Sequence, residues 1–273
     1  MVQEGDIDGP KIDAEKLIDN HYYSIASKAT IKTGSSIPVP VDKFKAFFQE
    51  DWEIVCSSGR AYNALEACKL LQLDADELTK VWRKAETENK SIKFGGGFYC
   101  AALDGPSGEK IYVFNGFFMA MRSKFAAANA SIHYFVVEWD PATLSWADFR
   151  AKLLGPTKPE EAPSDSLRGM ILAKWQELGL PAAPSGSDNG VHASASPFEG
   201  LAERCNWLNA SLTEDSFGKT LLAAGIPEET LRLWSVDPRV PLPPDGSEGS
   251  LFDALEDLDL DDCVAKAVAI AKM

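Results

Sequence analysis

The chain has 273 residues, of which 45% are hydrophobic and 25% charged, and its formal net charge is −14. This composition is typical of a globular protein with one large domain or slightly more. The acidic balance argues against nucleic acids and membranes as partners, because their phosphates would repel the chain. Any bound anion would therefore need a local cluster of cations.

Cysteine usage and the N-terminus bear on the compartment. The five cysteines have irregular spacings and form no C-x-x-C pair, which indicates reduced thiols rather than disulfides or a structural zinc site. The N-terminal stretch MVQEGDIDGPKIDAEK is acidic and polar, unlike a signal or transit peptide. No apolar run approaches the about 18 residues of a membrane span. We expect a cytoplasmic protein, and a removed presequence stays open.

Helices and strands are expected along the whole chain. Apolar periodicity and capping signals predict helices at 14–26, 42–52, 61–73, 75–88, 145–155, 167–179, 197–208, 229–234 and in the acidic, alanine-rich stretch 251–273. Apolar and β-branched runs between turn residues predict strands at 53–58, 97–103, 110–119 and 131–139. The proline-rich stretch 236–250 is expected to be a linker. Strands and helices without strict alternation indicate an α+β fold with a mainly antiparallel sheet.

A first candidate site lies in NGVHASAS, residues 189–196, which holds one of only three histidines. His192 precedes a helix start at which Ser196 is the expected N-cap and Glu199 the partner in a capping box. The free N–H groups and the helix dipole favour phosphate there, and they disfavour a protonated imidazole. Glu203 could accept a ring N–H of His192, and Ser194 could donate to an oxyanion. The alternative is a helix-cap histidine packed in a loop.

A second candidate site is the loop LLGPTKPEEAPSDSLRG, residues 153–169. Thr157, Lys158 and Arg168 bracket its prolines, and Arg150 lies just upstream. A threonine hydroxyl with an arginine guanidinium is a common phosphate-binding pair. The alternative is a solvated loop in which these cations offset the acidic side chains nearby.

Three further features of the sequence give weaker evidence for a functional site. The glycine run KFGGGFYC lacks the G-K-[ST] and G-x-G-x-x-G patterns, so a β-bulge or close backbone approach is expected. His21 and His133 have no partner at metal-ligand spacing and are expected to be structural. The acidic run 253–262 lacks the central glycine of an EF-hand. No metal ligands are therefore assigned in the chain.

The two candidate segments together resemble the nucleoside diphosphate kinases. The loop at 153–169 is similar to the family's L-G-x-T-x-P…R-G, with the distance from Thr157 to Arg168 kept without a gap. NGVHASASPFEGLAERCNWL is similar to N-x-x-H-G-S-D-S…E…W, with Trp207 at the final position. NGFFMAMRSKF and SIHYFVVEW resemble the family's upstream helix and strand. The likeness spans roughly residues 51–208.

The resemblance implies a fold and a domain organisation. It implies a ferredoxin-like antiparallel sheet with helices packed on it, in a domain over residues 51–215. Residues 1–50 and 216–273 would be N- and C-terminal extensions. Family members form hexamers or tetramers, so a homo-oligomer, or a larger protein assembly through the extensions, is expected.

The resemblance also implies an activity: transfer of a terminal phosphate between nucleotides through a phosphohistidine, with Mg²⁺ carried by the nucleoside triphosphate. His192 would be the nucleophile, Glu203 its orienting partner and Ser194 a stabilising neighbour. The implied nucleotide contacts are Thr157 and Arg168 to phosphates, Asn189 to a sugar hydroxyl, Phe117 to the base, and Arg150, one residue from the family's loop arginine.

The sequence departs from the family at several positions. Cys56, in the expected first strand VCSSG, stands where the family has a lysine that contacts the transferred phosphate. Ala193 and Ala195 replace a glycine and an aspartate, and about 11 extra residues precede Asn189. A lost transition-state contact costs about 2.7–4 kcal/mol. A catalytically weak or inactive kinase-like scaffold is therefore the alternative, and a hydrolase or other transferase at the same phosphate site is a third.

Overall fold

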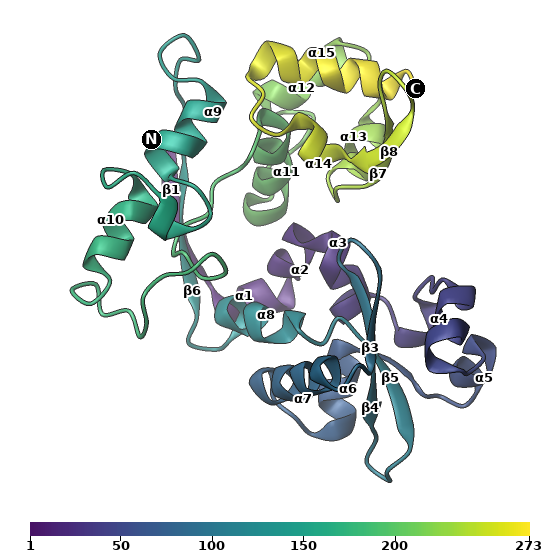
Figure 1. The fold of residues 1–273 in the computed structure, drawn as a ribbon. Helices are drawn as coiled ribbons and strands as arrows, with labels where there is room; N and C mark the ends of the chain where they lie inside the picture. The colour runs from purple at the N-terminus through teal and green to yellow at the C-terminus, as the bar shows by residue number, and fades with distance from the viewer. The chain divides into compact units, whose positions relative to one another are not determined.

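The computed structural model describes all 273 residues, which form two compact units, Met1–Val136 and Val137–Met273. Both units combine helices with small sheets, so the α+β class is confirmed (Figure 1). The expected boundaries after residues 50 and 215 do not coincide with this division, and the domain organisation implied by the resemblance stays a prediction. The finer, ferredoxin-like arrangement also stays a prediction.

The first unit contains a four-stranded sheet of order β2-β5-β4-β3. Its strands are β2 (Ala61–Asn63), β5 (Lys110–Phe114), β4 (Phe98–Asp104) and β3 (Ser91–Gly95). β2 pairs parallel with β5 and the other pairs are antiparallel, so the sheet is mixed. The bulge expected in the glycine run is present as a register shift between Lys93 and Gly95.

Hydrophobic clusters cover both faces of this sheet. In β5, Ile111 and Val113 point to one cluster, while Tyr112 and Phe114 point to the other, as strand alternation requires. The first cluster is closed by α6 (Ala64–Leu71), α7 (Ala75–Thr87) and α8 (Phe118–Ala126). The second is closed by α4 (Val41–Phe48) and α5 (Trp52–Ser57). The helices expected at 42–52, 61–73 and 75–88 are thus confirmed, with shorter bounds.

The strand expected at 53–58 is wrong, because these residues form helix α5. Trp52 and Val55 lie one helical turn apart and pack on the cluster around Phe44, whereas Ile54 is 57% exposed. The apolar residues thus follow the helical period rather than the alternation of a strand. Cys56, which the resemblance aligns with a lysine of the first strand, is therefore on a helix of the first unit.

The N-terminal segment forms a strand and three short helices. β1 (Gln3–Asp8) pairs antiparallel with β6 (Ser131–Val136). The single helix expected at 14–26 is instead three short helices, α1 (Gly9–Ala14), α2 (Leu17–His21) and α3 (Tyr23–Ala26). The chain breaks at Lys16, which has φ 59°. Buried Asp19 accepts from Arg122 Nε at 2.9 Å, and this pair ties α2 to α8.

The second unit begins with α9 (Trp146–Asp148), which continues as a π-helix over Phe149–Leu154. Ser145 caps α9 by accepting the Asp148 N–H at 3.1 Å, and Gly155, with φ 90°, ends this segment, so the helix expected at 145–155 keeps its bounds to within one residue. A short 3-10 helix (Pro159–Glu161) and α10 (Leu167–Lys174) follow. The expected helix at 167–179 is therefore shorter than predicted.

A group of helices and a hairpin completes the second unit around one hydrophobic cluster. Its elements are α11 (Pro197–Leu208), α12 (Ser216–Ala223), α13 (Glu228–Trp234), β7 (Arg239–Leu242), β8 (Ser247–Ser250), α14 (Leu251–Leu255) and α15 (Leu260–Ala271). The linker expected at 236–250 is wrong, since these residues form the β7–β8 hairpin. A two-stranded ribbon tolerates Pro241 because both strands are edges, and Val240 is buried in the cluster.

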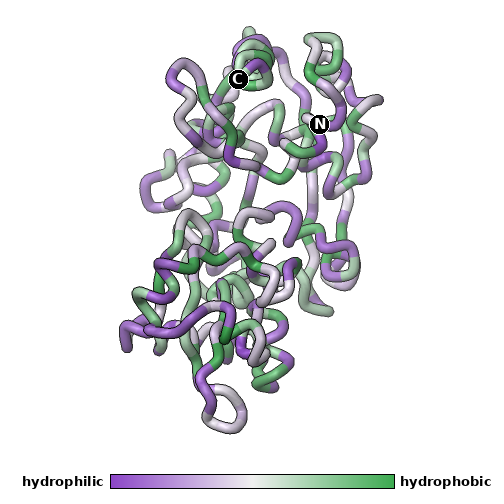
Figure 2. The backbone as a smooth tube through the Cα atoms, turned by 90° about the vertical axis from the view of Figure 1, so that its right-hand side faces the viewer, coloured by the Kyte–Doolittle hydropathy of each residue, from purple (hydrophilic) through white to green (hydrophobic).

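Polar and apolar residues are interleaved along the whole backbone (Figure 2). No helix is long and apolar enough to cross a bilayer.

Candidate functional site

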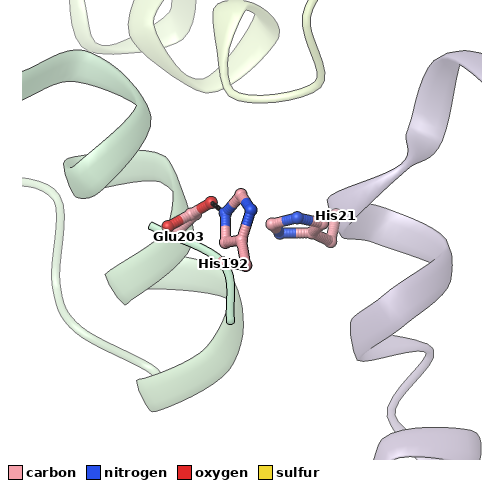
Figure 3. A group of neighbouring side chains, drawn as sticks. All are labelled: His21, His192 and Glu203. Carbon is pink, nitrogen blue, oxygen red and sulfur yellow. Dashed lines mark hydrogen bonds and ion pairs between the residues drawn. The ribbon is translucent and has the colours of Figure 1, made fainter. Parts of the chain in front are cut away.

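Glu203 links His192 and Ser194 through its two carboxylate oxygens. Nε2 of His192 lies 2.6 Å from Oε1 of Glu203 (Figure 3, which also draws His21 of the first unit). The Ser194 hydroxyl donates to Oε2 of the same carboxylate. The Glu203 side chain is only 17% exposed, whereas His192 is 49% exposed. A largely buried carboxylate thus holds an accessible imidazole, and the Ser194 hydroxyl is committed to Glu203 in this arrangement.

The start of α11 builds this cluster. Ser196 Oγ accepts the N–H of Glu199 at 3.1 Å, as expected of the N-cap. The capping box is only half formed, because the Glu199 carboxylate accepts the N–H of Ala195 at 2.7 Å and not that of Ser196. Glu199 and Glu203 are four residues apart and therefore share one helix face. Both carboxylates act on the turn that carries His192.

Two other segments of the second unit hold the same turn. The indole N–H of Trp146 donates to the carbonyl of Ser194 at 2.9 Å. The backbone N–H of Asp257 donates to the carbonyl of Ala195 at 2.9 Å. Trp146 is itself fixed by Asp259, whose carboxylate accepts its backbone N–H at 2.7 Å. The turn is therefore fixed from α9 and from the loop between α14 and α15.

The charges around His192 determine its protonation. Desolvation lowers the pKa of His192. The charge and hydrogen bond of Glu203, together with the charge of Glu199, outweigh desolvation and raise the pKa above the usual 6.5. The carboxylates thus favour the protonated imidazole, which is opposite to the effect expected of the helix N-terminus. Burial and the charge of Glu203 raise the pKa of Glu199 to about 7.

A pocket of about 260 Å³ lies beside this cluster and contains three of the predicted phosphate ligands. Arg150, Thr157 and Arg168 line it, together with Glu256 and Asp257. The remaining lining residues are Ala147, Ala151, Leu154, Gly155 and Pro156. The structure thus brings the loop at 153–169 and the upstream arginine to one cavity.

Arg168 connects the pocket to the histidine turn. It is 8% exposed, and its guanidinium donates to the carbonyls of Gly155 at 2.7 Å and Val191 at 3.0 Å. Its Nε is buried without a partner. Burial and the nearby charge of Arg150 lower the pKa of Arg168. Because Val191 directly precedes His192, Arg168 positions the nucleophile candidate as well as lining the pocket.

The other predicted site residues occupy different environments. The Asn189 side chain donates to the carbonyl of Thr157 at 3.1 Å, so it joins the two candidate segments. Lys158 pairs with Glu161 at 2.9 Å on the loop surface. Phe117 belongs to the first unit, where its ring lies 5.4 Å from that of Tyr99 and 5.9 Å from that of Trp82. Its role against a nucleotide base stays a prediction.

Sequence reasoning missed four groups at the site: Trp146, Glu199 as a site residue, Glu256 and Asp257. The four-residue spacing of Glu199 and Glu203 was a usable signal, because it places both carboxylates on one helix face. No local pattern marks the other three, which lie more than 40 residues from His192 in the chain.

The hydrogen bonds among Ser194, His192 and Glu203 distinguish a serine nucleophile from a histidine nucleophile. In a serine hydrolase the serine hydroxyl is bonded to the histidine, which removes its proton. Here the hydroxyl of Ser194 and the imidazole of His192 are both bonded to Glu203. This arrangement of hydrogen bonds favours a histidine oriented by a carboxylate over a serine activated by a histidine.

No family model, no curated protein and no solved structure matches the chain. The resemblance to the nucleoside diphosphate kinases therefore rests on the motifs in the sequence alone.

Proposed function

We propose that this protein binds a nucleotide and transfers its terminal phosphate to a second nucleotide through a phosphohistidine at His192, as nucleoside diphosphate kinases do. The observation that carries the proposal is the 2.6 Å contact between His192 Nε2 and Glu203. Because Nε2 faces the carboxylate, the proposed attacking atom is Nδ1. The proposal does not depend on a ferredoxin-like fold, since function follows the site rather than the fold.

The proposed reaction has two half-reactions. The Nδ1 lone pair of His192 attacks the terminal phosphorus, the N–P bond forms, and the bond to the bridging oxygen breaks. The nucleoside diphosphate leaves with that electron pair. Glu203 stabilises the positive charge that develops on the imidazole and keeps the ring oriented. In the second half-reaction a terminal phosphate oxygen of another nucleoside diphosphate attacks the phosphohistidine and regenerates His192.

The pocket beside the turn is the proposed phosphate site. Thr157 supplies a hydroxyl and Arg150 a guanidinium, while Arg168 contributes positive charge next to the transferred group. Mg²⁺ would arrive as part of the nucleotide substrate. Carboxylates of the kind that Mg²⁺ prefers are present at the pocket in Glu256 and Asp257, both paired with Arg150.

The test is incubation with γ-labelled ATP followed by detection of acid-labile protein phosphate. We expect label on the wild type and none on His192→Asn. His133→Asn is the matched control, because His133 also pairs with a carboxylate, Asp6, at 2.8 Å but lies on β6. Wild-type protein that binds nucleotide without acquiring label would contradict the proposed reaction.

A kinase-like scaffold without catalysis is the second candidate, and two observations favour it. Arg150 and Arg168 are both hydrogen-bonded within the chain, and Cys56 stands in place of the family's lysine. The scaffold would bind protein partners through its terminal segments. Equilibrium dialysis with ATP separates the candidates, because absence of nucleotide binding supports the scaffold alone.

A further inference from the structure

The pocket contains charges of both signs, and they are already paired. Nη1 of Arg150 lies 2.6 Å from Oε1 of Glu256 and 2.7 Å from Oδ1 of Asp257. The two carboxylates are 44% and 49% exposed, whereas Arg150 is 26% exposed. One guanidinium nitrogen of Arg150 thus donates to oxygens of two different carboxylates.

Asp257 also reaches the histidine turn through its backbone. Its N–H donates to the carbonyl of Ala195, three residues after His192, while its side chain pairs with Arg150. Asp257 has φ 60°, so the loop between α14 and α15 turns sharply at this residue. One residue thus touches both the proposed phosphate site and the turn of the nucleophile candidate.

We propose that Glu256 and Asp257 are built-in competitors of the phosphate ligand. They occupy Arg150 in the ligand-free protein, and an entering phosphate group binds by displacing them. The inference rests on the proposed function, because it takes the pocket as the phosphate site. Glu256 and Asp257 thereby lower the affinity of this site for a phosphate group.

The charges explain how the competition works. A phosphate group with two negative charges can accept both hydrogen bonds of Arg150 Nη1, and it concentrates in one group the charge that two separate carboxylates carry. The displaced carboxylates are half exposed, so water can solvate them. The backbone N–H of Asp257 can keep its bond to Ala195 while the side chain turns away, so the displaced carboxylate stays close to Arg150.

The experiment is calorimetric titration of the 273-residue protein with pyrophosphate. The variant Glu256→Gln/Asp257→Asn keeps side-chain size, and asparagine accepts the positive φ at 257. We expect it to bind pyrophosphate about tenfold or more tightly than the wild type. The phosphate would then displace neutral amides from Arg150 rather than charged carboxylates, which form stronger hydrogen bonds. Far-UV circular dichroism checks that the variant is folded.

Two comparisons isolate the competition from general repulsion. Asp148→Asn/Glu161→Gln removes the same charge from pairs with Lys152 and Lys158, and we expect its affinity to stay within about twofold of the wild type. In an Arg150→Gln background, neutralising Glu256 and Asp257 should add little, because there is no guanidinium to compete for.

The outcomes are distinct. Equal or weaker binding by the Glu256/Asp257 variant, while the wild type binds pyrophosphate, overturns the competitor role and leaves the phosphate site standing. If neutralising Glu256 and Asp257 increases pyrophosphate affinity equally in the Arg150→Gln background, the competitor role is also overturned. If neither protein binds pyrophosphate, the phosphate site itself fails, and with it both this inference and the proposed function.

Discussion

Glu199 and Glu203 lie one helical turn apart on α11, and each holds a different part of the turn that carries His192. Glu199 accepts the N–H of Ala195, whereas Glu203 binds the side chains of His192 and Ser194. Burial of the Glu199 carboxyl, and after it the neighbouring charge of Glu203, raise the pKa of Glu199 to about 7.

Glu199→Gln should stabilise the protein at alkaline pH but not at acid pH. A carboxyl whose pKa is raised on folding contributes stability below its unfolded pKa, near 4.5, and that contribution is lost as the pH rises through about 7. Glutamine has no such penalty and still accepts the Ala195 N–H. Urea unfolding should show a gain of about 1–3 kcal/mol at pH 8 and none near pH 4.5. A gain of equal size at both pH values would contradict the prediction.

His192 should titrate above its usual value. The Glu203 and Glu199 carboxylates outweigh desolvation and raise the pKa of His192, so the nucleophilic neutral form increases as the pH rises beyond 6.5. The stability that the pair supplies is complete below pH 6.5 and is lost as the pH rises through the raised pKa. NMR titration of the imidazole, assigned with His192→Asn, should give a midpoint above 6.5, and Glu203→Gln should lower it. A wild-type midpoint below 6.5 would refute this charge balance.

Arg168→Lys should destabilise the second unit by about 2–3 kcal/mol. A lysine ammonium cannot reproduce the planar fork that reaches the carbonyls of Gly155 and Val191. Arg232→Lys is the matched control, since Arg232 is 62% exposed and pairs only with Glu228, four residues away. Denaturant unfolding of both variants checks the prediction, and similar losses for the two would mean that the buried fork adds nothing.

Asp19→Ala should destabilise the first unit by about 3–5 kcal/mol. Asp19 is fully buried, and its loss leaves the guanidinium of Arg122 without its main buried partner. Asp13→Ala removes the second partner of Arg122, but Asp13 is 51% exposed, so a smaller loss is expected. Urea unfolding followed by circular dichroism compares the two. A larger loss for Asp13→Ala would reverse this ranking of the partners.

Most of the helix starts could be predicted because their signals are local, whereas several helices end earlier than predicted. Ser196 was predicted as an N-cap, and Asp74, Ser145 and Ser196 each accept the backbone N–H of the residue three positions later. The secondary structure was predicted wrongly where the local sequence allows two conformations and tertiary packing selects one of them. Val55 and Trp52 form a helix because they face the Phe44 cluster, and Val240 enters a strand because its side chain is buried against the helices of the second unit.

The sequence by itself determined the helix start at Ser196, the spacing of His192, Ser194 and Glu203, and hence the carboxylate–imidazole pair. These depend on a few neighbouring residues and on helical geometry, which the order of residues encodes directly. Only the tertiary structure decided that Trp146 and Asp257 hold the same turn, and that Glu256 and Asp257 pair with Arg150. Those contacts join residues separated by 48 to 107 positions, and the packing of the hydrophobic core, rather than any local pattern, brings them together.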